Sequence, residues 1–223
     1  MKLAIILSCL FVLFLGVESR SYPHHVTLKK DIFNVYWAYN ATDQAFYFKV
    51  VAKTTGWVGF ALTLEKGSAN MANYDIALGG VKNNVTYLKD YWVNGKTKPT
   101  LDTKQDVIPL SASEADGTTT LEYSRKADTQ DPNNQDIKIK RENDSVVYMA
   151  WARGDADANS DTDYSEHGDK AQGGRGHTAV GYNMFTGQKI EPSTQTTTTS
   201  TTMYLVPSLA FLVVVQLLKL MLI

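Results

Sequence analysis

The chain has 223 residues, of which 43% are hydrophobic and 20% are charged, and its formal net charge is -1. This near-neutral balance gives no electrostatic reason to expect a nucleic acid as partner, because nucleic-acid binding depends on clustered positive charge. The single cysteine, Cys9, lies in an apolar N-terminal run, so we expect a folded domain without disulfides.

The two ends of the chain resemble targeting signals rather than parts of a fold. Lys2 precedes an apolar run, which is typical of a secretory signal peptide and is assigned to residues 1–19. At the other end, a Thr/Ser-rich linker over residues 186–202 leads into a hydrophobic segment over residues 203–223. That segment has two interpretations, a lipid-anchor signal or a membrane-spanning helix, and the small residues and polar spacer before it favour the lipid anchor. We therefore expect an extracellular protein, secreted or held at the outer face of the plasma membrane by its tail.

Three Asn-x-Ser/Thr triplets agree with an extracellular location. They begin at Asn40, Asn84 and Asn143, and all fall at predicted strand ends or turns. A bulky polar glycan is accommodated at such positions, so the three asparagines are predicted glycosylation sites.

Between the two ends, large apolar residues recur with a period of two. Phe33, Val35, Trp37 and Tyr39 share one face of the first such run. This alternation is typical of strands with one buried face. The predicted strands cover residues 33–39, 45–52, 57–62, 74–81, 86–93, 107–113, 118–126, 145–152 and 178–182.

Short turns separate these runs, and no segment has the pattern of an amphipathic helix. Asp116-Gly117 predicts a type I′ hairpin, and the stretch over residues 82–84 predicts a second tight turn. We therefore predict one all-β domain over residues 20–185, an antiparallel β-sandwich with an immunoglobulin-like two-sheet architecture. Residues 153–175 form one long loop, and loops of that length often have a function.

Several segments, in this order and spacing, resemble the DOMON domain, which also occurs in copper monooxygenases such as dopamine β-monooxygenase. They are Trp-Val-Gly-Phe-Ala-Leu at 57–62, Asn-Met-Ala-Asn-Tyr-Asp-Ile-Ala-Leu-Gly-Gly-Val at 70–81, Tyr-Leu-Lys-Asp-Tyr-Trp at 87–92, residues 102–106, residues 120–126, Val-Tyr-Met-Ala-Trp-Ala at 147–152, and His-Gly and Arg-Gly at 167–168 and 175–176. The resemblance implies a two-sheet sandwich that acts as an extracellular module for haem or sugars. In the monooxygenases, two further copper domains perform the hydroxylation. This chain has only four histidines and no His-x-His element, so we expect no enzyme activity.

The resemblance also implies a candidate haem site. Some DOMON-like cytochromes hold b-type haem between a methionine and a histidine, and the corresponding positions here are Met71 and His167. A thioether and an imidazole are both good axial ligands for haem iron. In the alternative interpretation, Met71 only fills an apolar gap and His167 is a surface loop residue.

An acidic stretch in the long loop suggests a second ligand, calcium. Oxygen-bearing side chains occur with the spacing of an EF-hand loop at Asp155, Asp157, Asn159, Asp161, Asp163 and Glu166. Ser160 occupies the position where an EF-hand has glycine, and no helices are predicted on either side. The alternative is therefore a solvated acidic loop.

Three functions follow from these observations. The first is a ligand-binding module for haem or a carbohydrate. The second is a small b-type haem electron-transfer protein that uses Met71 and His167 as axial ligands. The third is an accessory extracellular domain that contacts another protein and binds no small ligand.

Overall fold

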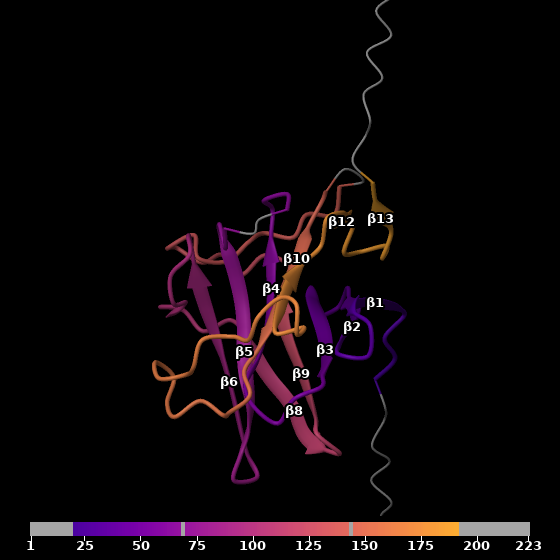
Figure 1. Cartoon of the computed structure of the whole chain (residues 1–223). Helices are drawn as coiled ribbons and strands as arrows, with labels where there is room; N and C mark the ends of the chain where they lie inside the picture. Colours follow the sequence, from indigo (N-terminus) through magenta and orange to yellow (C-terminus); the bar gives the residue numbers. More distant parts are fainter. Residues whose placement is uncertain (1–19, 68–69, 143–144, 192–223) are drawn as a thin grey trace, which may run out of the picture. The chain divides into compact units, whose positions relative to one another are not determined.

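The computed structural model describes residues 20–67, 70–142 and 145–191. The described residues form two antiparallel sheets and a short two-stranded ribbon, and they contain no helix (Figure 1). The five-stranded sheet has the order β1-β2-β3-β9-β8, the six-stranded sheet has the order β11-β10-β4-β5-β6-β7, and β12 pairs with β13. The strands are β1 His24–Lys29, β2 Phe33–Asn40, β3 Ala45–Ala52, β4 Val58–Thr63, β5 Tyr74–Lys82, β6 Val85–Val93, β7 Thr100–Leu101, β8 Ile108–Ala115, β9 Thr118–Lys126, β10 Tyr148–Arg153, β11 Arg175–His177, β12 Gly181–Tyr182 and β13 Lys189–Ile190.

The predicted all-β sandwich is confirmed, and so are both predicted tight turns. Asp116 and Gly117 have φ values of 51° and 68° and join paired strands β8 and β9. Asn83 and Asn84 have φ values of 53° and 61° and join β5 to β6. Two consecutive residues with positive φ are characteristic of type I′ turns, whose twist suits a hairpin.

The main core lies between the two sheets, and the period-two pattern produces it. Phe33, Val35 and Trp37 of β2 are fully buried and point toward the six-stranded sheet. Phe60 of β4 packs on Phe48 of β3, with ring centroids 5.8 Å apart. Burial of these large apolar side chains stabilises the sandwich through the hydrophobic effect.

The six-stranded sheet is buried on its second face as well. In β4, every residue from Val58 to Thr63 is buried, although a strand with one solvent-exposed face would alternate. Loop 154–174 covers this outer face, and in Figure 1 it crosses in front of β5 and β6 in orange. A second apolar cluster that includes Trp57, Ile76 and Tyr164 forms beneath the loop.

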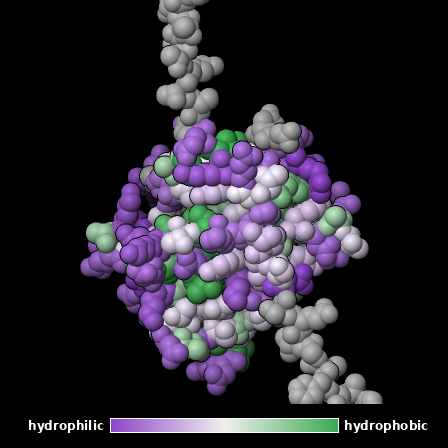
Figure 2. Space-filling view, turned by 90° about the vertical axis from the view of Figure 1, so that its right-hand side faces the viewer, coloured by the Kyte–Doolittle hydropathy of each residue, from purple (hydrophilic) through white to green (hydrophobic). Residues whose placement is uncertain are grey.

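The side of the molecule nearest β1 and β2 is different. It is mainly hydrophilic, with hydrophobic residues only in small separate areas (Figure 2). In β1, half-buried and exposed residues alternate along the strand. The larger apolar surface outside the main core lies on the outer face of the six-stranded sheet, beneath loop 154–174.

The ordered fold continues beyond residue 185, where the predicted domain ended. Trp37 Nε1 donates a hydrogen bond of 2.8 Å to the carbonyl of Met184, and Met184 is buried. The short strand β13 then pairs with β12. The first residues of the predicted linker therefore belong to the domain, because the β12–β13 ribbon closes one end of the core.

Close packing at Gly79 gives a test of the register between β5 and β6. A Cβ atom at Gly79 would lie 2.2 Å from the carbonyl oxygen of Tyr87, which is backbone and cannot move aside easily. We expect Gly79→Ala to lower the free energy of unfolding by about 1–3 kcal/mol, as overpacking typically does. Gly59→Ala is the control, because its Cβ would meet its nearest neighbour at 3.4 Å. Urea unfolding of both variants measures the difference, and equal stabilities would contradict the register.

No helix long and apolar enough to cross a membrane occurs within the described part of the chain. The predicted signal peptide, residues 1–19, and the predicted hydrophobic anchor, residues 203–223, lie outside the described residues.

Candidate ligand-binding pocket

A cavity of about 680 Å³ lies between loop 154–174 and the outer face of the six-stranded sheet. Its floor combines Ile76 and Leu78 of β5 with small outward-facing residues of β4 and β10, namely Gly59, Ala61, Ala150 and Ala152. Their inward-facing neighbours are large, as with Phe60 and Trp151. The missing side-chain volume on the outer face leaves space for a ligand, and the volume is within the usual range for small-molecule sites.

Aromatic side chains form the walls of the cavity. Trp57 and Tyr164 meet nearly edge to face, with centroids 5.7 Å apart, and Tyr91 contacts Tyr164 in the same way at 5.9 Å. Trp57 Nε1 donates to Ser165 Oγ at 3.2 Å. Burial raises the pKa of Tyr164 to about 12, so its hydroxyl stays protonated and donates to the carbonyl of Pro99 at 2.9 Å.

Tyrosines of β6 fix the loop over the sheet. The Tyr87 hydroxyl donates to Asp157 Oδ1 at 3.1 Å and accepts a hydrogen bond from the amide of Ala158 at 3.1 Å. The Tyr91 hydroxyl donates to the carbonyl of Asp161 at 2.7 Å. Burial raises the pKa of both tyrosines well above the usual range, so they stay neutral donors. The cavity therefore has a roof that is attached to the sheet.

The structure brings Met71 and His167 to the same cavity, although they lie far apart in the sequence. Met71 precedes β5, has a φ of 55°, and is half-buried against the aromatic cluster. Non-glycine residues with positive φ are uncommon and often occur at functional sites. The amide of Gly95 donates to the carbonyl of Met71 at 3.0 Å, which holds this backbone in place.

His167 comes from the loop and contacts the first residue of β11. Arg175 Nη1 lies 3.0 Å from His167 Nδ1. Because a guanidinium can only donate, Nδ1 accepts this hydrogen bond, and in the neutral ring the proton is therefore on Nε2. The interaction fixes both the orientation and the tautomer of the imidazole in the absence of a ligand.

The cavity is apolar inside and basic at its edge. Its lining includes four cationic side chains, Lys96, Lys98, Lys170 and Arg175, and one carboxylate, Glu166. Lys98 Nζ lies 4.4 Å from the centroid of the Tyr164 ring and donates to the carbonyl of Thr162 at 2.6 Å. Such a rim favours ligands with negative charge.

The predicted calcium loop is not formed, because its acidic side chains do not converge. Among the described residues, only Asp75, Asp90 and Asp136 bring ligand atoms of three His, Cys, Asp or Glu residues within 4.8 Å of one another. Hydrogen bonds from Tyr87 and Tyr91 hold the loop to the sheet at Asp157 and Asp161, and its side chains do not surround one point, as those of an EF-hand loop do. The six residues are engaged in different places. The Asp155 side chain pairs with Arg153, that of Asp157 accepts from Tyr87, and Asn159 donates to Asp163, whereas Asp161 offers its backbone carbonyl to Tyr91 and Glu166 lines the cavity.

Two of the predicted glycosylation sites are among the described residues. Asn84 is exposed in the β5–β6 turn. Asn40 is half-buried at the end of β2, where its Oδ1 accepts hydrogen bonds from the amides of Thr42 and Asp43. Asn143 lies outside the described residues.

Sequence reasoning identified Met71 and His167 but missed the floor and rim of the cavity. The signal for the floor was present in the alternation of large and small residues, as in Trp57-Val58-Gly59-Phe60-Ala61. In β4 and β10 the small residues occupy the outer face, whereas in β5 that face carries Tyr74, Ile76 and Leu78. The rim lysines carry no comparable signal, because a single lysine in a loop is common on any surface.

Comparison with known proteins agrees with this architecture. The DOMON domain model matches residues 29–154, which is more than half of the chain. The chain is 33% identical over 138 residues to the mouse DBH-like monooxygenase protein 1 and 33% identical over 134 residues to the Drosophila melanogaster MOXD1 homolog 2. These matches cover 61% and 59% of the chain but only 21% and 17% of the relatives, so the chain spans about a fifth of their length.

Two solved structures share the fold at low sequence identity. The cytochrome b domain of pyranose dehydrogenase from Coprinopsis cinerea gives a TM-score of 0.51 at 13% identity, covering 73% of this chain and 82% of that one. The cytochrome domain of Myriococcum thermophilum cellobiose dehydrogenase gives 0.51 at 14% identity, covering 76% and 85%. The family match and the sandwich together lead to one conclusion: the chain belongs to the DOMON domain family.

Proposed function

We propose that this domain is a haem-binding module, with b-type haem in the outer-face cavity and Met71 and His167 as its axial ligands. The observation that supports this most strongly is the position of Met71 and His167 on one apolar cavity. The two solved cytochrome domains that share the fold are themselves haem proteins by name. When bound, haem would supply one-electron chemistry, and the thioether and imidazole would set its potential.

The residues of the cavity suit such a ligand. The aromatic walls and small-residue floor favour a flat apolar ring, and the cationic rim favours the negatively charged propionates at its edge. One adjustment is needed. Binding of iron through Nε2 of His167 requires the proton to be on Nδ1, so Arg175 must leave Nδ1 and becomes available to pair with a propionate.

We further propose that the domain is displayed outside the cell, tethered by its C-terminal segment, and that it binds its ligand without hydroxylating a substrate. The four histidines of the chain include no His-x-His element to form a copper site. A binding or electron-transfer role requires only the cavity that the domain itself provides.

An optical titration tests the haem proposal. Purified residues 20–191 are mixed with haemin, and we expect one equivalent to give a sharp Soret band with the visible bands of a six-coordinate, low-spin haem. Met71→Leu should keep haem in the cavity but lose the low-spin spectrum. Loss of a residue that only supports a metal ligand typically lowers metal affinity by roughly 10–100-fold. Because His167 would itself bind the iron, His167→Ala should lower haem affinity by more than this.

Two matched variants serve as controls. His177→Ala removes the second histidine of the same cavity, and Met184→Leu changes a methionine that is buried in the main core. Both should bind haem as the unmodified domain does. A folded domain without a Soret band would overturn the proposal, and the aromatic walls would then favour a carbohydrate ring as the ligand.

A further inference from the structure

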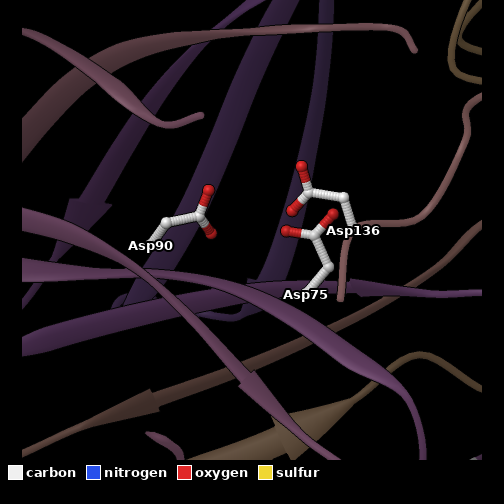
Figure 3. A group of neighbouring side chains, drawn as sticks. All are labelled: Asp75, Asp90 and Asp136. Atoms are coloured by element: carbon white, nitrogen blue, oxygen red, sulfur yellow. The ribbon is translucent and has the colours of Figure 1, made fainter. Parts of the chain in front are cut away.

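A second group of polar residues lies between the two sheets, away from the cavity. Asp75 of β5 and Asp90 of β6 point inward from the six-stranded sheet, on the same faces as Ala77 and Leu88 of the main core. Asp136 comes from the segment between β9 and β10. Figure 3 shows the carboxylates of Asp75 and Asp136 side by side, with that of Asp90 turned toward them.

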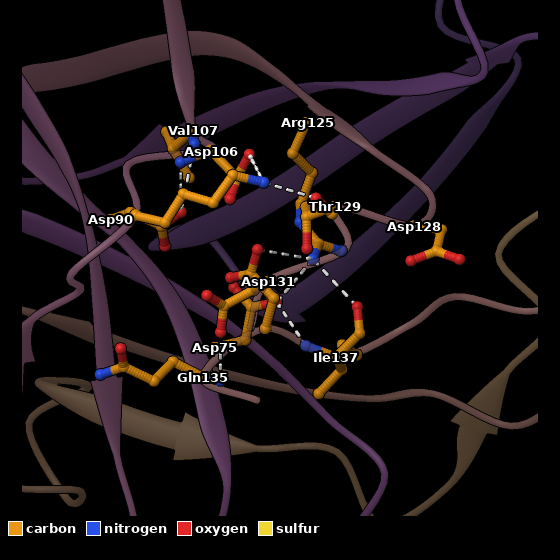
Figure 4. Close-up of polar contacts among 12 residues, drawn as sticks. Asp75, Asp90, Asp106, Val107, Arg125, Asp128, Thr129, Asp131, Gln135 and Ile137 are labelled. Atoms are coloured by element: carbon orange, nitrogen blue, oxygen red, sulfur yellow. Dashed lines mark hydrogen bonds and ion pairs between the residues drawn. The ribbon is translucent and has the colours of Figure 1, made fainter. Parts of the chain in front are cut away.

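One arginine faces this cluster from the opposite sheet. Arg125 of β9 is 2% exposed, and its Nη2 contacts Asp75 Oδ2 at 2.9 Å and the carbonyl of Ile137 at 2.9 Å (Figure 4). The same Nη2 lies 3.8 Å from Asp136 Oδ2. If all three carboxylates were ionised, they would carry three negative charges against the one positive charge of Arg125, and two negative charges would be left uncompensated. Uncompensated buried charge is strongly unfavourable in a protein interior.

Several buried oxygens of this region have no hydrogen-bond partner in the described structure. They include Asp90 Oδ1, both carboxylate oxygens of Asp136, and Asp102 Oδ2. Asp90 is 0% exposed, and its other oxygen accepts from the amides of Asp106 and Val107 at 3.1 Å each. Burial raises the pKa of Asp136, and the Arg125 charge and the Thr129 hydroxyl oppose this rise without giving either carboxylate oxygen a hydrogen bond. Buried oxygens of this kind usually have a partner, which can be an ion.

The carboxylates disturb one another electrostatically when no cation is present. Burial, reinforced by Asp75 and Asp136, raises the pKa of Asp90 to about 9. Burial also raises the pKa of Asp75 to about 7, although the charge of Arg125 opposes this rise. Burial lowers the pKa of Arg125, but Asp75, Asp136 and Asp90 outweigh it, so the pKa of Arg125 is raised and the guanidinium stays charged.

We propose that Asp75, Asp90 and Asp136 bind a divalent cation of the calcium class between the two sheets. The ion would balance the two negative charges left in excess when all three carboxylates are ionised, and it would give the unpartnered oxygens of Asp90 and Asp136 a ligand. Oxygens bound to one calcium ion at 2.3–2.6 Å lie at most about 5 Å apart, and one oxygen from each of the three carboxylates lies within 4.8 Å of the others. The site is independent of the haem proposal, because these residues do not line the cavity.

Thermal unfolding in calcium and in chelator tests the site. We expect the Tm of the chelated domain to rise with calcium, by about 5–10 °C at a hundredfold excess over the dissociation constant. Terbium provides a second readout on the unmodified domain. Tyr123, which is buried beside Asp75, and Trp92, which pairs with Asp75 across the strands, should sensitise its luminescence, and calcium should displace it.

Asn substitutions distinguish this site from the acidic loop. Asp90→Asn keeps the side-chain shape, removes one charge, and should abolish the calcium-dependent shift without lowering the Tm in chelator. Asp161→Asn is the control in the loop and should keep the full shift. If Asp90→Asn fails to fold, the terbium signal of the unmodified domain and the Asp136→Asn variant give the answer.

Two results would overturn the proposal. The first is a folded domain with the same Tm in calcium and chelator and with no terbium luminescence that calcium displaces. The second is a calcium shift that disappears in Asp161→Asn and survives in Asp90→Asn, because it would place the ion on the loop.

Discussion

Arg125→Met is expected to lower the free energy of unfolding by about 3–5 kcal/mol, among the largest effects of any single substitution in the domain. Methionine fills a similar volume but leaves Asp75 and Asp136 facing each other without a cation from the opposite sheet. It also leaves the carbonyl of Ile137 without its donor. Urea unfolding in chelator, compared with the unmodified domain, measures the loss.

Lys49→Met is the matched control, because it also replaces a cation that faces a carboxylate. Lys49 Nζ lies 3.7 Å from Glu122 Oε1, and the two side chains are 38% and 25% exposed. An ion pair so accessible to water should contribute less than about 1 kcal/mol. If Arg125→Met cost no more than Lys49→Met, the inter-sheet cluster would not have the electrostatic character described above.

The second large effect is expected for Trp57→Ala, which should destabilise the domain by about 3–5 kcal/mol and remove most of its affinity for haem. Trp57 is 3% exposed, lines the cavity and contacts the loop through Ser165 and Tyr164. Its backbone carbonyl also accepts from the amide of Gly154 at 2.9 Å. Loss of the indole therefore opens one wall and loosens the roof. Urea unfolding and haemin titration measure the two losses separately.

Trp37→Ala separates the two effects. Trp37 is a tryptophan of similar burial, but it lies in the main core and does not line the cavity. It should cost a similar free energy of unfolding while leaving haem affinity unchanged under conditions where the variant is folded. Equal loss of haem affinity in the two variants would show that binding responds to general stability and not to the cavity.

Much of the fold could be predicted from the sequence, because strand formation here depends on a local pattern. The period of two in residues 33–39 and 45–52 corresponds to strands β2 and β3. The hairpin at Asp116-Gly117 was readable because few residues tolerate positive φ. The edge strand β1 and the short β13 were not predicted, because their patterns are short and only one face of β1 is half-buried.

The candidate sites were less predictable, because they depend on contacts between distant residues. Asp75 and Asp90 each appear in a strand, and nothing in the sequence shows that Arg125 and Asp136 lie beside them. For the acidic loop the sequence error was the opposite one, because a local pattern predicted a site that the structure does not form. Its spacing fits an EF-hand, but the spacing assumes a loop whose side chains surround one point, and hydrogen bonds from Tyr87 and Tyr91 hold this loop against the sheet at Asp157 and Asp161. Met71 and His167 were found through the family resemblance alone.

Hydrogen exchange with and without haemin is the most direct test of the central claim, that the ligand lies on the outer face of the six-stranded sheet. We predict slower exchange on binding in loop 154–174 and around Met71 and Lys96–Pro99, which surround the cavity. Exchange in β1, β2 and β8 of the other sheet should not change. Binding of one haem equivalent with protection confined to the five-stranded sheet would contradict the account.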